Sequence, residues 1–385
     1  MLAAISHQPA DYAPCAFMIF SALRGRSRDY LDFINREVDL GLDAVVELST
    51  WGPGTGSDHP DLPGPPLHFH PDTDVVEWVE DRPEGRLIHR RYDTPAGPLS
   101  AAVRWTEDWK AGPHVPLMDD WVIPRAEKFL IRTDEDLDRL PFVLAPVDDE
   151  ARAQLSKMAE PRKALAQEKQ LLVSSGLGVG LEAAAWLCGY DTVLWAAIDR
   201  PEWLDRLVTI LHNWNVTRME ALLELGVDIF IRRAWYEGTD FLSPAIFRQF
   251  VLPSLRREVD LAHQAGAKFG YINTSGSMPI LDMLIEAGVD VLIGVDPVQG
   301  KGTDLAQMRR STAGRLALWG GVNGFVTVER GSPEAVREAV REAVRVLGPV
   351  GFILSPVDNV TGSSNKVWAN VEAFVDEWRG LTQAP

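Results

Sequence analysis

The sequence has few cysteines, fewer basic than acidic residues, and no long apolar run. Its two cysteines, Cys15 and Cys188, are too few for a disulfide framework or a thiolate metal cluster. The 38 lysines and arginines against 55 aspartates and glutamates give a formal charge of −17, which argues against a nucleic acid partner. No segment approaches about 18 consecutive apolar residues, and the first residues lack the pattern of a signal peptide. We expect a cytoplasmic protein that binds neither nucleic acid nor membrane.

The chain has 385 residues, 46% of them hydrophobic and 24% charged, which is enough to build a large globular core. Short apolar runs alternate with longer segments of helical period, and glycine often stands between helix and run, where it supplies a left-handed helix end. Eight such runs are predicted as strands: 16–20, 44–48, 171–174, 228–231, 268–272, 291–295, 316–319 and 351–354. Eight strand and helix units without a dinucleotide-binding glycine motif predict an α/β fold, a (β/α)₈ TIM barrel.

Two helix starts and one long insertion complete this prediction. Ser243-Pro244 and Ser332-Pro333 each place serine at the N-cap and proline in the first turn. Residues 52–169 interrupt the repeat between the second and third strands, and we expect them to form a cap within a single domain that spans residues 1–385. Within the insertion we predict a hairpin that turns at residues 94–97, a short helix capped at Thr133, and a longer helix over residues 148–169.

Several motifs follow one another in the order of the predicted strands. They are AISHQPADYAPC at the start, GTDFLSPAIFRQFVLPSLRREVDLAHQAGAK, LIEAGVDVLIGVDP, LWGGVN and GFILSPVDNV, the last followed by NVEAFVDEW. In these blocks the chain resembles the uroporphyrinogen decarboxylase superfamily over nearly its whole length. That superfamily contains cofactor-free porphyrinogen decarboxylases and methyltransferases that serve corrinoid, coenzyme M or folate-like carriers, so the resemblance implies one of these activities on a barrel fold.

The sequence departs from the decarboxylase pattern of this superfamily. The stretch that resembles its arginine motif is MIFSALRGR, with Ile19 at the first arginine position and Arg24 approximately at the second. Thr50 stands at the position of the catalytic aspartate, and Asp358 at the position of a histidine after the eighth strand. A threonine hydroxyl does not replace the anion that stabilises a protonated pyrrole. These changes argue against porphyrinogen decarboxylation.

The zinc ligands of the methyltransferase branch are also replaced. Its His-x-Cys after the fifth strand reads Asn273-Thr274-Ser275 here, and its later cysteine falls near Asp358. Neither asparagine nor serine supplies the soft anionic ligand that zinc prefers. If a metal is bound, the candidate ligands are Glu237, Asp296 and Asp358, an oxygen set that suits a harder ion.

Glu237 and Asp358 are the candidate catalytic residues, because each follows a predicted strand at the end where barrel enzymes place their chemistry. Glu237 follows an aromatic pair whose desolvating effect would raise its pKa for acid or base work, and the alternative is an ion pair with Arg232 or Arg233. Asp358 suits a base, a metal ligand or an acceptor for a substrate hydroxyl, and the alternative is a turn formed with Asn359.

The remaining candidates are expected to contact substrate from the same end of the strands. For Asp296-Pro297 a plain turn is the favoured alternative, and turn chemistry explains Asn273 and Ser275 equally well. Arg24 suits an anionic group, with a solvated charge run as the alternative. The candidate substrate-binding residues are Arg24, Thr50, Trp51, Tyr236, Tyr271, Asn273, Ser275, Asp296, Trp319 and Asn323. His59, His68 and His70 in the insertion form a weaker metal candidate, with a proline-rich surface loop as the favoured alternative.

The leading functional prediction is an enzyme that transfers a methyl or one-carbon group from a small organic substrate to a corrinoid or folate-like carrier. The first alternative is a cofactor-independent decarboxylase (a lyase) of an aromatic or pyrrolic acid, with Arg24 on the carboxylate. The second is a catalytically silent barrel that binds a ligand. For methyl transfer, the expected cofactor is a divalent metal or a corrinoid or folate-like carrier, whereas decarboxylation would need no cofactor. The expected partners are a small substrate, a corrinoid carrier protein and a second copy of the chain in a homodimer.

Overall fold

The computed structural model describes residues 1–49, 69–177, 180–299 and 303–382. The chain divides into two compact units. The parallel-sheet unit contains Met1–Leu48, Met158–Ser175 and Leu225–Pro385, and the hairpin unit contains Ser49–Lys157 and Gly176–Glu224. Most of the predicted insertion therefore belongs to the hairpin unit, together with a later stretch of chain. Its expected role as a cap stays a prediction.

Seven strands form the parallel sheet, in the order β1-β6-β7-β8-β9-β10-β11. They are β1 (Val45–Glu47), β6 (Leu172–Leu177), β7 (Ile229–Arg233), β8 (Lys268–Ile272), β9 (Val291–Val295), β10 (Ala317–Asn323) and β11 (Phe352–Val357). Each coincides with one of the last seven predicted runs. Their carboxyl ends meet at one edge of the sheet, because all the strands run the same way.

The sheet is curled around a shared apolar core. Val45 of β1, the first strand in the sheet order, and Ile353 of β11, the last, belong to the same packed cluster. Strands β6, β7, β9 and β10 contribute Leu172, Ile229, Val291, Ile293, Ala317 and Trp319 to it, and α1 (Leu2–Ile5) adds Ala4 and Ile5. Side chains from both edges of a flat sheet would lie too far apart to share one cluster, so the shared core shows the curl.

The prediction of eight barrel strands is confirmed only in part. Among the described residues, the first predicted run is not a strand and makes isolated bridges beside β11, Cys15 with Leu354 and Ile19 with Asn359. The ladder is interrupted because Met18 N donates to Ser355 Oγ at 2.8 Å and not to a backbone carbonyl. The result is a curled seven-stranded parallel sheet with a bridged segment at its edge, and a complete (β/α)₈ barrel is not shown.

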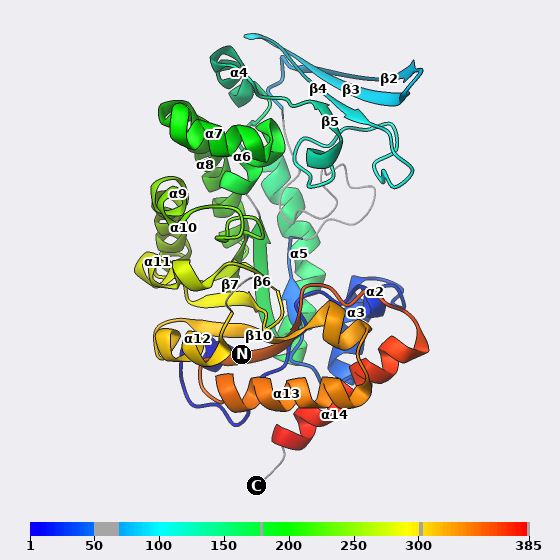
Figure 1. Ribbon diagram of the computed structural model, residues 1–385, viewed down its shortest axis with the longest axis vertical. Coiled ribbons are helices and arrows are strands. Elements are labelled where there is room, and N and C mark those ends of the chain that lie inside the picture. Colours follow the sequence, from blue (N-terminus) through cyan, green and yellow to red (C-terminus); the bar gives the residue numbers. More distant parts are fainter. Residues whose placement is uncertain (50–68, 178–179, 300–302, 383–385) are drawn as a thin grey trace. The chain divides into compact units, whose positions relative to one another are not determined.

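Helices follow or precede the strands as the sequence pattern predicts. In the parallel-sheet unit these are α2 (Ser21–Arg24), α3 (Tyr30–Asp39), α9 (Pro244–Ile246), α10 (Leu252–Gln264), α11 (Leu281–Ala287), α12 (Leu305–Thr312), α13 (Pro333–Leu347) and α14 (Asn365–Thr382). The short π-helices η3 (Phe247–Val251) and η5 (Gly324–Glu329) and the 3-10 helix η4 (Met278–Ile280) belong to the same unit. Helices α13 and α14 pack side by side (Figure 1). The predicted caps are confirmed, since Ser243 Oγ accepts from Ile246 N at 3.2 Å and Ser332 Oγ from Ala335 N at 3.3 Å.

The hairpin unit contains a four-stranded antiparallel sheet in the order β2-β3-β4-β5. Its elements are β2 (Asp74–Arg82), β3 (Gly85–Thr94), β4 (Gly97–Arg104), β5 (Ala126–Lys128), α4 (Asp134–Arg139), α6 (Leu181–Cys188), α7 (Tyr190–Asp199) and α8 (Pro201–Leu223), with the 3-10 helices η1 (Ile123–Arg125) and η2 (Leu140–Phe142). Helix α5 (Asp149–Lys169) has residues in both units. The predicted turn at residues 94–97 is confirmed, because Thr94 pairs with Gly97.

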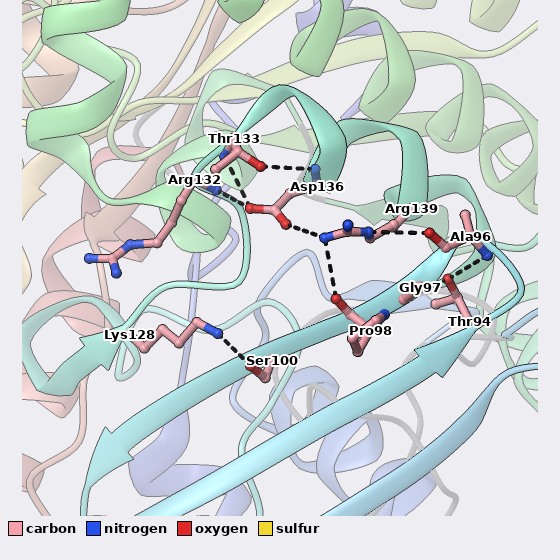
Figure 2. Close-up of polar contacts among 10 residues, drawn as sticks. All are labelled: Thr94, Ala96, Gly97, Pro98, Ser100, Lys128, Arg132, Thr133, Asp136 and Arg139. Atoms are coloured by element: carbon pink, nitrogen blue, oxygen red, sulfur yellow. Dashed lines mark hydrogen bonds and ion pairs between the residues drawn. The ribbon is translucent and has the colours of Figure 1, made fainter.

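Figure 2 shows how this hairpin turn is attached to α4. Thr133 and Asp136 form the capping box predicted at the start of the helix, with Thr133 Oγ1 3.3 Å from Asp136 N. From the last residue of α4, Arg139 donates to Ala96 O and to Pro98 O, each at 3.4 Å. The helix therefore holds both sides of the turn between β3 and β4.

No helix in the described part of the chain is both long enough and apolar enough to cross a membrane.

Candidate functional site

Most of the predicted site residues of the parallel-sheet unit fall on the loops after β7, β8, β9 and β11 or at the end of β10. The exceptions are Tyr271 within β8, Trp319 within β10 and Arg24 on α2. The structure separates them into a buried ion cluster behind β7 and β8, a pair of aspartates after β9 and β11, and several residues that serve packing. Thr50, Trp51, His59 and His68 lie outside the described residues. His70, at the other end of that histidine cluster, accepts from Asp72 N at 3.2 Å in the hairpin unit.

Glu237 belongs to a buried ion cluster. Arg232 Nη2, at the end of β7, lies 2.8 Å from both Glu237 Oε1 and Oε2, and Arg232 Nη1 donates to Glu258 Oε2 of α10 at 2.9 Å. Tyr271 OH of β8 donates to Glu237 Oε2 at 2.7 Å. All four side chains are almost fully buried. The ion pair that the sequence allowed as an alternative for Glu237 is therefore present.

The charges in this cluster are mutually stabilised. Burial alone would lower the pKa of Arg232, but Glu237 and Glu258 outweigh burial and raise it, so the guanidinium stays charged. Both oxygens of Glu237 already accept hydrogen bonds from protein groups. This arrangement suits positioning of the loop after β7, and catalysis by Glu237 stays a prediction.

Asp296 links the loops after β9 and β10. Its Oδ1 accepts from Val298 N at 2.7 Å and Gln299 N at 3.0 Å, which confirms the turn that Asp-Pro indicates. Its Oδ2 accepts from Asn323 Nδ2 at 2.7 Å, and Asn323 Oδ1 in turn accepts from Val326 N at 2.6 Å. Asp296 is 2% exposed, and burial raises the pKa of its carboxyl although these hydrogen bonds oppose the rise.

Asp358 follows β11 in a left-handed backbone conformation, with φ of 67°. A non-glycine residue in this region is uncommon and is often found at functional sites. The side chain is exposed, yet the surrounding protein partly desolvates it. This desolvation raises the pKa of Asp358, and the negative charge of Asp296 raises it further. The charge of Asp296, after β9, thus acts on the carboxyl of Asp358, after β11.

Asn359 attaches this aspartate loop to the start of α2. Asn359 Oδ1 accepts from Ser21 N at 3.1 Å, and Asn359 Nδ2 donates to Ser21 Oγ at 2.9 Å. Arg24 lies one helical turn further along α2, is exposed, and has its guanidinium carbon 6.0 Å from the centre of the Tyr30 ring. The fold therefore brings Arg24 into the neighbourhood of the Asp358 loop through α2.

Asn273 and Ser275 hold the loops after β7 and β8 together. Asn273 Nδ2 donates to Ala234 O at 3.0 Å, while its buried Oδ1 has no hydrogen-bond partner among the described residues. A Cβ atom on Gly238 would lie 2.1 Å from Ser275 O, so the two loops meet at a position only glycine fits. Asn273 Oδ1 remains a candidate acceptor for a substrate donor.

Two aromatic candidates serve packing in this structure. Trp319 is 3% exposed, donates from Nε1 to Ala16 O at 2.9 Å, and belongs to the core inside the curled sheet. Tyr236 is half-buried and packs edge-on against Phe241, with ring centres 5.2 Å apart. Contact of either residue with substrate stays a prediction.

The described residues contain no group of three or more histidine, cysteine, aspartate or glutamate side chains placed to hold a metal ion. Glu237, Asp296 and Asp358 therefore do not gather into the oxygen-rich site considered from the sequence. Glu237 accepts hydrogen bonds from Arg232 and Tyr271. Asp296 accepts hydrogen bonds from Asn323 and from backbone N–H groups of the turn that it begins.

Sequence reasoning missed the role of Glu258. It is 2% exposed on α10 and completes the ion cluster through Arg232. A signal was present, because Glu258 recurs at helical spacing with the apolar residues Leu255 and Ala262 of the same face. A carboxylate on an apolar helix face indicates a buried cationic partner.

Comparisons with known proteins were made on sequence and on structure. The family model described as uroporphyrinogen decarboxylase (URO-D) matches residues 106–381. No curated protein matches the chain in sequence. A methyltransferase from Methanosarcina mazei has a similar structure, with a TM-score of 0.58 and 16% identity, covering 99% of this chain and 97% of that one. At that identity the likeness concerns the fold.

A B12-independent methionine synthase from Shewanella, solved with selenomethionine, gives a TM-score of 0.41 at 11% identity, over 58% of this chain and 66% of that one.

Proposed function

The chain belongs to the uroporphyrinogen decarboxylase (URO-D) family, and from this we propose that it is an enzyme of methyl or one-carbon transfer, with Asp358 as its proton-transfer group. The observation that carries the proposal is the placement of Asp296 after β9 and Asp358 after β11, where burial raises the pKa of both carboxyls and the charge of Asp296 adds to the rise at Asp358. Carboxyls with raised pKa values at the carboxyl ends of barrel strands are suited to general acid or base work.

The proposed reaction moves a methyl group from an oxygen, nitrogen or sulfur atom of a small substrate to a carrier. The carrier, corrinoid or folate-like, supplies the nucleophile that accepts the methyl group. When the bond between methyl and heteroatom breaks, its electron pair stays on the heteroatom, which then needs a proton. Asp358 in its protonated form gives that proton. The negative charge of Asp296 raises the pKa of Asp358, because it disfavours a second negative charge on the Asp358 carboxyl.

Apolar side chains border the aspartate pair and support a substrate with an apolar portion. Val298 is 52% exposed on the turn that Asp296 closes, and Phe325 and Val326 are 47% and 50% exposed on the turn that Asn323 caps. The hydrogen bond from Asn323 Nδ2 to Asp296 Oδ2 joins these two turns. Exposed apolar residues grouped beside polar ones are typical of ligand-binding surfaces.

Decarboxylation is the second candidate, and Arg24 is the observation that favours it. Arg24 is exposed, close to the Asp358 loop through α2, and makes no ion pair with any described residue. An available guanidinium suits a substrate carboxylate, and protonated Asp358 would then protonate the carbanion left by loss of CO₂.

The test is to incubate the purified chain with methyl ethers, methylamines and methyl thioethers in the presence of reduced cobalamin or tetrahydrofolate, and to measure the methylated carrier. We expect transfer from at least one substrate class, and a loss of about 10²-fold or more in Asp358→Asn, the usual worth of a general acid. Asp260→Asn, at an exposed position on α10, is the matched control and should keep full activity. Release of CO₂ from aromatic acids with no methyl transfer would replace the proposal by decarboxylation, and no turnover of either kind would favour a silent binding barrel.

A further inference from the structure

The antiparallel sheet of the hairpin unit ends in a strand with a free side. In the described part of the chain, β2 pairs with β3 over its whole length and has no strand on its other side (Figure 1). The register between the two strands is continuous from Asp74 to Arg82, and β2 contains no proline, glycine or lysine. Proteins usually protect an edge strand by such residues, by a bulge or by charge. Of these devices β2 has only charge.

The charges of β2 are largely neutralised within the chain. Three of its four carboxylates form ion pairs: Glu77 with Arg90 at 3.8 Å, Glu80 with Arg82 at 2.8 Å, and Asp81 with Arg86 at 3.3 Å. The fourth, Asp74, is exposed and makes no ion pair with a described residue. Arg82 gives Nε and Nη2 to Glu80, and its Nη1 has no partner among the described residues. Asp74 and Arg82 stand about 27 Å apart at the two ends of β2, so they cannot pair with each other within one copy.

The backbone groups on the free side of β2 can be identified from the neighbouring strands. Trp105 N donates to Arg86 O at 2.9 Å, so the backbone groups of Arg86 face β4. Asp81 lies opposite Arg86 in the ladder between β2 and β3, and it therefore turns its own N–H and C=O away from β3. Alternate residues of an antiparallel strand share this direction, which gives residues 75, 77, 79 and 81. No hydrogen bond joins these backbone groups to another described residue.

A second copy of β2, antiparallel to the first and with Trp78 opposite Trp78, would use all of these groups. Val75 then lies opposite Asp81, and Glu77 lies opposite Val79. The four residues would exchange backbone hydrogen bonds with the same four residues of the second copy. Because a twofold axis repeats every contact, one strand supplies both sides of such an interface.

Charge selects this register from its neighbours. Asp74 of each copy lies opposite Arg82 of the other, so the unpaired carboxylate faces the guanidinium that has an unused Nη1. No carboxylate lies opposite another carboxylate. The next register in either direction would place Glu77 opposite Glu77 or opposite Asp81, and like charges directly opposite one another destabilise a ladder.

Trp78 and Val76 give the interface an apolar centre. They are 41% and 43% exposed and lie two residues apart on one face of β2. The indole of Trp78 stacks on the ring of His89 in β3, with ring centres 4.7 Å apart and planes 3° from parallel. In this register the two Trp78 residues form a non-hydrogen-bonded pair, the position where side chains of opposite strands come closest. Aromatic pairs at such positions stabilise a sheet.

We propose that two copies of the chain associate through β2, about a twofold axis at Trp78, and join their four-stranded sheets into one continuous antiparallel sheet. The second copy is the occupant because the free backbone groups, the unpaired charges and the exposed tryptophan of β2 all find their complement in β2 itself. The homodimer expected from the sequence then has this strand at its interface. The inference rests on the hairpin unit alone and does not depend on the proposed reaction.

Cysteine cross-linking tests the register. In Trp78→Cys the two new thiols lie opposite each other in a non-hydrogen-bonded pair, with Cα atoms about 4.5 Å apart, which is within the range of a disulfide. Val76→Cys is the matched control at a similarly exposed position, and its two thiols are offset by about 13 Å along the strands. Mild oxidation of the whole protein should give a covalent dimer with Trp78→Cys and not with Val76→Cys. Background should be low, since Cys15 and Cys188 are both buried.

Sedimentation velocity over a range of protein concentrations tests the association itself. We expect the unmodified chain to form a dimer, and Trp78→Lys to raise its dissociation constant by about 30-fold or more, because a central tryptophan is lost and two like charges meet at the axis. Trp195→Lys, at a 68% exposed position on α7, is the matched control and should remain dimeric. A monomer at every concentration, dissociation by Trp195→Lys in place of Trp78→Lys, or equal cross-linking of the two cysteine variants would overturn the proposal.

Discussion

Arg232 and Glu237 form a buried ion pair, in which a single nitrogen, Arg232 Nη2, lies 2.8 Å from each oxygen of the carboxylate. The pair joins the end of β7 to the loop that follows it, and Glu258 and Tyr271 complete the cluster from α10 and β8. The loop after β7 is therefore held through Glu237 by the charge of Arg232 and the hydroxyl of Tyr271, which gives the cluster a structural role that can be measured.

We predict that Glu237→Gln destabilises the chain by about 1.5 to 3 kcal/mol, the worth of a hydrogen bond to a charged group, because Glu258 still pairs with the buried Arg232. Urea unfolding followed by circular dichroism measures this change, and Glu338→Gln, in an exposed ion pair on α13, is the control with an expected effect below about 1 kcal/mol. The protein that remains folded should keep most of its activity. Full stability together with lost activity would instead assign catalysis to Glu237.

The coupling of the two aspartates predicts a shift in titration. Since the charge of Asp296 raises the pKa of Asp358, Asp296→Asn should lower that pKa, with Asp260→Asn as an unaffected control. ¹³C NMR of the aspartate carboxyls measures it without a substrate. If Asp358 is the proton donor, the alkaline limb of the rate profile moves to lower pH in the variant. An unchanged pKa would mean that the two carboxyls act separately.

Much of the fold was predictable because its signals are local. Apolar runs, most of them preceded by a helix and a glycine, predicted the last seven strands, and serine before proline predicted the starts of α9 and α13. The first run has the same composition and yet is no strand. Its failure depends on Ser355, which takes the Met18 amide and lies far away in sequence.

The location of the candidate site could be predicted from the sequence, but the interactions of its side chains could be predicted less well. The rule that barrel chemistry follows the strands selected Asp296, Asn323 and Asp358, which the structure links or couples. It also selected Glu237, but a sequence does not show whether a carboxylate faces solvent or an arginine. The orientation of Glu237 toward Arg232 depends on Glu258 and Tyr271, which lie on α10 and β8 and complete the buried cluster.

The contact at Gly238 predicts a strong effect of one methyl group. In Gly238→Ala the new Cβ would lie 2.1 Å from Ser275 O and 2.8 Å from Asn273 Nδ2, so the loops after β7 and β8 must separate. We expect a loss of stability of about 1 to 3 kcal/mol, as for other overpacked sites, together with reduced activity. Gly380→Ala, which has open space on α14, should be neutral or stabilising in the same unfolding assay. Equal behaviour of the two variants would contradict the close approach.

Glu37 predicts that stability falls as pH rises. It lies on α3, is 5% exposed, and burial raises its pKa from 4.5 to about 8. Below its unfolded pKa the carboxyl is protonated in both states, whereas between the two values unfolding releases a proton and becomes easier as pH rises. The loss reaches up to about 5 kcal/mol above pH 8, from about 1.4 kcal/mol for each unit of pKa difference.

Glu37→Gln removes this titration while keeping the shape of the side chain. Urea unfolding at pH 4.0, 6.0 and 8.5 should show the variant close to the unmodified chain at the lowest pH and increasingly more stable above it. Glu342→Gln, in an exposed ion pair on α13, should show no such trend and serves as the control. A constant difference between Glu37→Gln and the unmodified chain at all three pH values would mean that Glu37 is charged in the folded protein and has a partner that stabilises it.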